Sequence, residues 1–107
     1  MAVTWAATGV TEGVSSSGKR TKTATLTPTG TYTTGGDALP LAALGLKRVT
    51  ALYQRGLGGF VDPGYSVDLA GTLTAPLIRL FETNNTQMAG STSITGRAFV
   101  AYVEGYE

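Results

Sequence analysis

Threonine occupies every second position of residues 21–33, and this alternation limits the possible folds more than any other feature of the chain. Threonine is branched at Cβ and favours extended backbone. Ala24 and Leu26 lie between the threonines and therefore share the opposite face, so residues 21–27 are predicted to form a half-buried β-strand. Pro28 is expected to end this strand, because proline cannot donate a hydrogen bond within a sheet.

Other short segments show the same apolar and polar alternation, and turns rich in glycine and proline separate them. Strands are predicted at residues 3–7, 46–54, 77–81 and 97–104, with a hairpin formed by residues 60–61 and 65–69 and a further short strand around residues 93–94. Residues 38–44 are the only segment with helical character, and they fall short of the ~12 residues that an isolated helix needs. The fold is therefore predicted to be all-β, a compact β-sandwich of the jelly-roll type, with an immunoglobulin-like sandwich as the alternative.

A chain of 107 residues is long enough for one small domain. Residues 1–20 are predicted to be an N-terminal strand followed by a flexible arm, because residues 9–20 hold three glycines and three consecutive serines without a sustained period. Residues 21–107 are predicted to be a single β-sandwich domain. Trp5 is expected to anchor the N-terminal strand, and it is a candidate for contact with a partner subunit.

The chain contains no cysteine and no histidine. It therefore has no disulfide, no thiolate nucleophile and no imidazole base, which excludes most hydrolase mechanisms. A glycosidase needs two carboxylates across a cleft, and Asp62 and Asp68 are the nearest candidates because they flank the turn at Pro63 and Gly64. Carboxylates at such turns mostly serve to solvate the chain. We expect no enzyme activity, no cofactor and no metal.

Eight Lys and Arg residues against seven Asp and Glu residues give a formal net charge of +1. This balance does not suit a protein that binds the phosphates of nucleic acid. The N-terminus resembles no signal peptide, and no apolar run approaches the ~20 residues of a membrane-spanning helix. Lys19, Arg20 and Lys22 form the one basic cluster. They either solvate the start of a strand or bind an acidic partner surface.

Two segments carry a resemblance to a known family. Residues 32–49 read YTTGGDALPLAALGLKRV, and residues 96–105 read GRAFVAYVEG. The first segment resembles a motif of small structural proteins in tailed-bacteriophage virions, and the second is similar to the closing strand of the same group. The resemblance covers residues 21–107. It points to the capsid decoration proteins, also called cement proteins.

The resemblance implies a compact sandwich, commonly a homotrimer, that binds the outer head surface and stabilises contacts between major capsid subunits. It also implies location on the virion capsid after assembly in the host cytoplasm. Such a protein needs no catalysis and gains from repeated weak contacts, which agrees with the composition. The alternative is a tail or host-attachment module that binds carbohydrate through exposed tyrosines such as Tyr65, Tyr102 and Tyr106.

Overall fold

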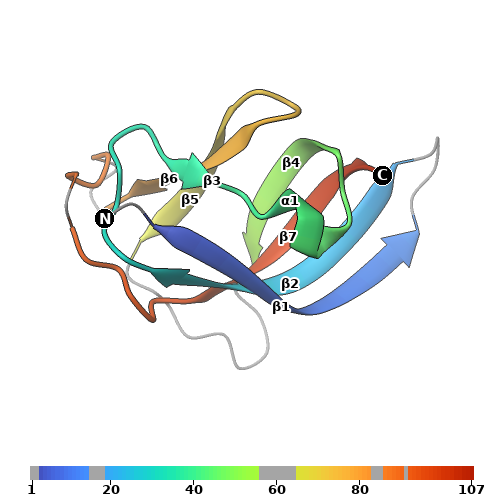
Figure 1. Cartoon of the computed structure of the whole chain (residues 1–107), viewed down its shortest axis with the longest axis horizontal. Coiled ribbons are helices and arrows are strands. Elements are labelled where there is room, and N and C mark those ends of the chain that lie inside the picture. Colours follow the sequence, from blue (N-terminus) through green and yellow to red (C-terminus); the bar gives the residue numbers. More distant parts are fainter. Residues whose placement is uncertain (1–2, 15–18, 56–64, 83–85, 91) are drawn as a thin grey trace.

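The computed structural model describes residues 3–14, 19–55, 65–82, 86–90 and 92–107. These residues form a β-sandwich of two antiparallel sheets (Figure 1). One sheet has the strand order β1-β2-β7-β4, and the other has the order β3-β6-β5. The elements are β1 (Thr4–Val14), β2 (Arg20–Thr29), β3 (Asp37–Ala38), α1 (Leu41–Leu44), β4 (Arg48–Arg55), β5 (Ser66–Gly71), β6 (Pro76–Phe81) and β7 (Phe99–Tyr106).

The two antiparallel sheets confirm the predicted all-β sandwich. β2 pairs with β7 in one sheet, and β3 pairs with β6 in the other. The strands between them in the chain, β4 and β5, lie in different sheets and contact each other. This nested order of strands is compatible with the predicted jelly-roll type, and β1 adds an edge strand to it. An immunoglobulin-like sandwich would instead place the last strand beside β6.

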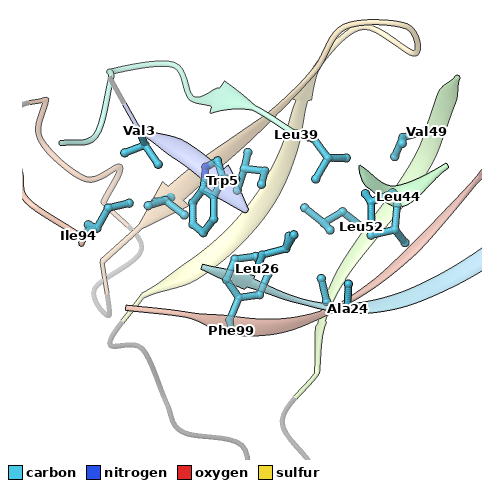
Figure 2. Close-up of a cluster of buried hydrophobic side chains, with 14 of the residues drawn as sticks. Val3, Trp5, Ala24, Leu26, Leu39, Leu44, Val49, Leu52, Ile94 and Phe99 are labelled. Carbon is cyan, nitrogen blue, oxygen red and sulfur yellow. The ribbon is translucent and has the colours of Figure 1, made fainter. Parts of the chain in front are cut away.

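The core lies between the two sheets, where the inward positions of the alternating strands meet. Ala24 and Leu26 of β2, Phe99 and Val103 of β7, and Ile78 of β6 are all buried there. Figure 2 shows side chains from both layers converging on this region. The buried apolar residues are Val3, Trp5, Ala24, Leu26, Tyr32, Leu39, Leu44, Leu46, Val49, Leu52, Tyr65, Ile78, Leu80, Met88, Ile94, Phe99, Ala101 and Val103.

The N-terminal segment differs from the predicted flexible arm. β1 continues through Val14 and pairs with β2 along most of its length. The register shifts between Thr8 and Thr11, where Gly9 has a φ of 62°. Because this shift interrupts the alternation of apolar and polar residues, the second half of the strand was not predicted from the sequence. Residues 15–18 lie outside the described residues. Residues 3–14 are therefore part of the sandwich.

Other predicted elements are confirmed in shortened or shifted form. The helical segment is reduced to α1, because β3 uses residues 37–38 and Pro40 occupies the N-cap position. The predicted strand at 93–94 is a single bridge between Thr31 and Ser93. The turn at residues 62–64 and the predicted strand at 60–61 lie outside the described residues.

The segment YTTGGD, residues 32–37, connects the two sheets through hydrogen bonds. The backbone N–H of Leu80 in β6 and the side-chain amide of Gln87 both donate hydrogen bonds to the buried hydroxyl of Tyr32, at 3.2 and 2.9 Å. The Thr33 N–H donates to a carboxylate oxygen of the buried Asp37 at 3.1 Å. These contacts tie the end of the first sheet to β3 and β6. The motif therefore has a structural role in this fold.

Candidate functional site

The outer face of the four-stranded sheet carries an uncharged patch of hydroxyl and aromatic side chains. Ala24 and Leu26 point into the core, so the threonines between them point outward. On β7, Val100 and Tyr102 alternate with the buried Phe99 and Ala101 in the same way. We use the name Thr–Tyr face for six outward residues of β2, β4 and β7: Thr23, Thr25, Thr27, Tyr53, Val100 and Tyr102. The next outward residue of β7, Glu104, carries a charge and borders this face.

Strand register brings these residues into direct contact range across the sheet. Thr25 pairs with Val100, and Thr23 pairs with Tyr102. On the other side of β7, Tyr102 pairs with Tyr53, and the two rings lie 6.1 Å apart at an angle of 45°. Tyr53 is 56 % exposed. Two neighbouring tyrosine rings at one end of a threonine row offer both apolar area and hydrogen-bonding groups.

The position of Tyr53 depends on an irregularity in β4. The register shifts between Val49 and Ala51, so Val49 and Leu52 both point into the core although they are three residues apart. Strict alternation over the predicted strand at residues 46–54 would place Val49, Ala51 and Tyr53 on one face. The bulge reverses this for Tyr53, which points outward beside Tyr102. Nothing in the local alternation marks the extra residue, so the tyrosine pair was not predicted.

The predicted partner-binding cations all face carboxylates of the same chain. Lys19 lies 3.7 Å from Glu104, and Arg20 lies 2.9 Å from Glu107. Lys22 is 8 % exposed and its ammonium group is hydrogen-bonded to Glu12. That hydrogen bond, together with the charge of Lys22, lowers the pKa of Glu12 from its ordinary value of 4.5. The positive charges of the basic cluster are therefore paired with carboxylates of the same chain.

Lys22 and Trp5 are both internal residues. Lys22, Ala24 and Leu26 are spaced two residues apart in β2 and therefore share its inward face. This spacing alone could have predicted that Lys22 points inward. Trp5 is 4 % exposed and packs edge-on against Phe99, with ring centroids 5.5 Å apart. Neither side chain forms part of the Thr–Tyr face.

The three tyrosines of the predicted carbohydrate site do not lie together at the surface. Tyr65 is 4 % exposed, and its hydroxyl donates a hydrogen bond to the backbone oxygen of Arg97. Burial raises the pKa of Tyr65, against the opposing effect of the Arg97 charge. Tyr102 and Tyr106 are half-buried, and the Arg48 guanidinium lies 4.7 Å from the centre of the Tyr106 ring. Stacking on a sugar through Tyr65 is excluded in this structure.

The described residues do not show the predicted pair of Asp62 and Asp68. Asp68 is paired with Arg79 on the neighbouring strand β6, and Asp62 lies outside the described residues. Within the described residues, no group of three or more Asp, Glu, His or Cys side chains is placed to hold a metal ion. No helix that the structure describes is long and apolar enough to cross a membrane.

A shallow hollow of about 720 Å³ lies beside α1 and is lined by Leu41, Ala42, Gly45, Leu46, Lys47 and Glu107. Its walls are mainly aliphatic, with one cation and one carboxylate at the rim. It offers contact area but no reactive group.

Comparison with models of known protein families, with curated proteins and with solved structures returned no match. The functional argument therefore rests on the sequence and on the geometry of the described residues.

Proposed function

We propose that this chain is a capsid decoration protein of a tailed bacteriophage, which binds the outer surface of the head and stabilises contacts between major capsid subunits. The observation that carries the proposal is the Thr–Tyr face, where six uncharged side chains lie on neighbouring strands of one sheet, bordered by Glu104. The resemblance of residues 32–49 and 96–105 to phage virion proteins supplies the biological setting.

The Thr–Tyr face suits contact with another folded protein. Hydroxyl groups can donate and accept hydrogen bonds without the desolvation cost of a full charge. Each tyrosine can bury on the order of 150–250 Å² when a partner covers it. Aromatic residues at the centre of an interface commonly supply much of its binding free energy. Because a head presents many equivalent sites, modest affinity at each one is sufficient for stable coverage.

Compensation of the cations supports the same type of binding. Lys19, Arg20 and Lys22 already interact with carboxylates of the chain, and the formal net charge is +1. Long-range electrostatic attraction to the shell would therefore be weak at ordinary ionic strength. Packing and hydrogen bonding at the Thr–Tyr face would hold the protein in place.

The test is occupancy on purified heads that lack the protein. Thr25 is the central threonine of the face, so Thr25→Lys places a charge between Val100 and the neighbouring threonines. We expect this variant to lose about tenfold or more in apparent affinity, because a charge must be desolvated at the contact. Ser66→Lys adds the same charge at an exposed position of β5, on the other sheet, and serves as the matched control.

Thermal melting of both variants shows whether the fold is retained. Equal head occupancy of wild type, Thr25→Lys and Ser66→Lys would contradict the assignment of the Thr–Tyr face. Absence of wild-type binding to heads, combined with retention on tails or on host polysaccharide, would contradict the decoration function itself and favour the attachment module.

A further inference from the structure

β1 is an edge strand of the four-stranded sheet: it pairs with β2 on one side, and it also contacts β3 and α1 outside that sheet. It has 11 residues, and the segment from Thr4 to Val10 contains no charged residue and no proline. Natural edge strands are commonly protected by such residues, because an open edge can pair with another chain. This edge is unprotected in the first half of β1.

The register identifies the backbone groups that face away from β2. The Gly96 N–H donates a hydrogen bond to the oxygen of Pro28 at 3.0 Å, so Pro28 directs its backbone toward the side of β7. Since successive residues of a strand direct their backbone groups to alternate sides, Thr27 faces β1 and pairs with Ala6. The N–H and C=O groups of Trp5 and Ala7, on either side of Ala6, consequently point to the open edge.

These edge groups have no backbone partner within the described residues. Outside the ladder with β2, no backbone hydrogen bond of the described chain involves a residue of β1. The side chains of Thr4, Ala6 and Thr8 are exposed on the outer face, next to the threonines of β2. Among the described residues, an incoming strand would therefore find two residues whose backbone donors and acceptors have no partner, and no charged side chain to displace.

We propose that the first half of β1 pairs with the same segment of a second copy, antiparallel about a two-fold axis at Ala6. In this register Trp5 of each copy lies opposite Ala7 of the other. The two residues with outward backbone groups thus meet each other and form two hydrogen-bonded pairs, with four N–H to C=O bonds.

The side chains also fit this register. Thr4 lies opposite Thr8 of the second copy, and threonine pairs are favourable across antiparallel strands. Ala6 faces its own copy at the axis, where a small side chain avoids crowding. Each tryptophan is opposite an alanine on the inner face. The pairing joins two four-stranded sheets into one continuous sheet, and it extends the threonine rows across the contact.

This arrangement is closed and isologous, so it predicts a dimer. It differs from the trimer that the family resemblance implies, and it does not depend on the proposed function because it concerns the purified chain alone. Self-association of the purified chain can therefore be tested independently of attachment to heads.

Cysteine cross-linking gives a direct test of the register, because the natural chain contains no cysteine. In Ala6→Cys the two new residues form a non-hydrogen-bonded pair, with Cβ atoms about 4.5–5.5 Å apart, close to the separation that a disulfide spans. Thr8→Cys is the matched control on the same strand and face. The two cysteines of the control variant would lie about 13 Å apart, since four residues separate position 8 from its pairing position 4.

We expect Ala6→Cys to form a disulfide-linked dimer on mild oxidation, at a rate at least about tenfold above that of Thr8→Cys. Equal rates, or no linked dimer from Ala6→Cys, would overturn the proposed register.

Sedimentation of the full chain tests the dimer itself. Ala7→Pro removes an outward N–H donor while leaving the hydrogen bonds between β1 and β2 in place, and proline is tolerated at edge positions of this kind. The wild type is expected to sediment as a dimer at high micromolar concentration, and Ala7→Pro as a monomer with an unchanged circular dichroism spectrum. A wild-type monomer or trimer over this range would overturn the proposal.

Discussion

At the residue scale, Lys22 shows how a charge can be part of the interior. It lies on the inward side of β2, is 8 % exposed, and contacts Glu12 from the neighbouring strand. A buried ammonium group is tolerated only with a hydrogen-bonded counter-charge. The carboxylate of Glu12 provides that charge. Lys22 therefore contributes to the pairing of β1 with β2 rather than to the binding of an acidic partner surface.

The Glu12 interaction predicts a defined pH dependence. Because the pKa of Glu12 is lowered below 4.5 in the folded state, its contribution to stability is present above pH 4.5 and is lost as the pH falls through the folded-state pKa. Glu12→Gln should lower the melting temperature at pH 7. Thermal melts should show this deficit shrinking below pH 4.5.

Glu82→Gln, at an exposed carboxylate, is the control and should change the melting temperature little at any pH. A Glu12→Gln deficit that stays constant from pH 7 to pH 3 would argue against the charge interaction as its cause.

At the element scale, the turn from Thr33 to Gly36 joins the bridge at Thr31 to β3. The Gly36 N–H donates to the oxygen of Thr33 at 2.9 Å, and both Gly35 and Gly36 have positive φ, at 96° and 110°. The two glycines differ in their surroundings. A Cβ on Gly36 would lie 2.9 Å from the backbone oxygen of Ile78, whereas a Cβ on Gly35 would meet nothing within 4 Å.

This difference makes the two glycines a matched pair. Gly35→Ala should cost about 1 kcal/mol, from backbone strain alone. Gly36→Ala should cost about 2–4 kcal/mol, because strain is combined with a collision against β6. Urea unfolding of the two variants measures both values. Equal losses would indicate that β6 moves aside without cost, and that the turn does not fix the spacing between β3 and β6.

At the scale of the whole molecule, β1 is a structural component of the sandwich. Trp5 packs against Phe99, Val3 is part of the same core, and Ala7 packs against that core. Truncating a buried tryptophan costs about 3–5 kcal/mol, against a total stability of about 5–15 kcal/mol for a domain. Removing the entire strand would also expose the edge of β2 and leave Lys22 without Glu12.

We therefore expect the chain lacking residues 1–14 to be unfolded. Far-UV circular dichroism and the dispersion of amide resonances provide the measurement. Trp5→Phe in the full-length chain is the control and should remain folded at reduced stability, because it keeps an aromatic ring in the core. Cooperative melting of the truncated chain would show that β1 is dispensable and that residues 1–14 act as a separate arm.

The sequence alone determined the class of fold and one half of the Thr–Tyr face. Alternation is strict in β6 and β7, and in β2 from Lys22 onward, because each strand has one face in the core, so a period of two can be read directly from the residues. The threonines of β2 were assigned in this way to the face opposite Ala24 and Leu26. The absence of cysteine and histidine is likewise a property of the sequence.

Tertiary structure decided the features that depend on a strand's neighbours. The bulges at Gly9 in β1 and near Thr50 in β4 shift the alternation by one residue, and only pairing with β2 and β7 reveals them. They place Tyr53 beside Tyr102 and extend β1 to Val14. The ion pairs of Lys19 and Arg20 depend on Glu104 and Glu107, which are distant in the chain, and that of Lys22 depends on the pairing of β1 with β2. Local sequence constrains the direction of a side chain, whereas the residue it meets is determined by which strands pair and in what register.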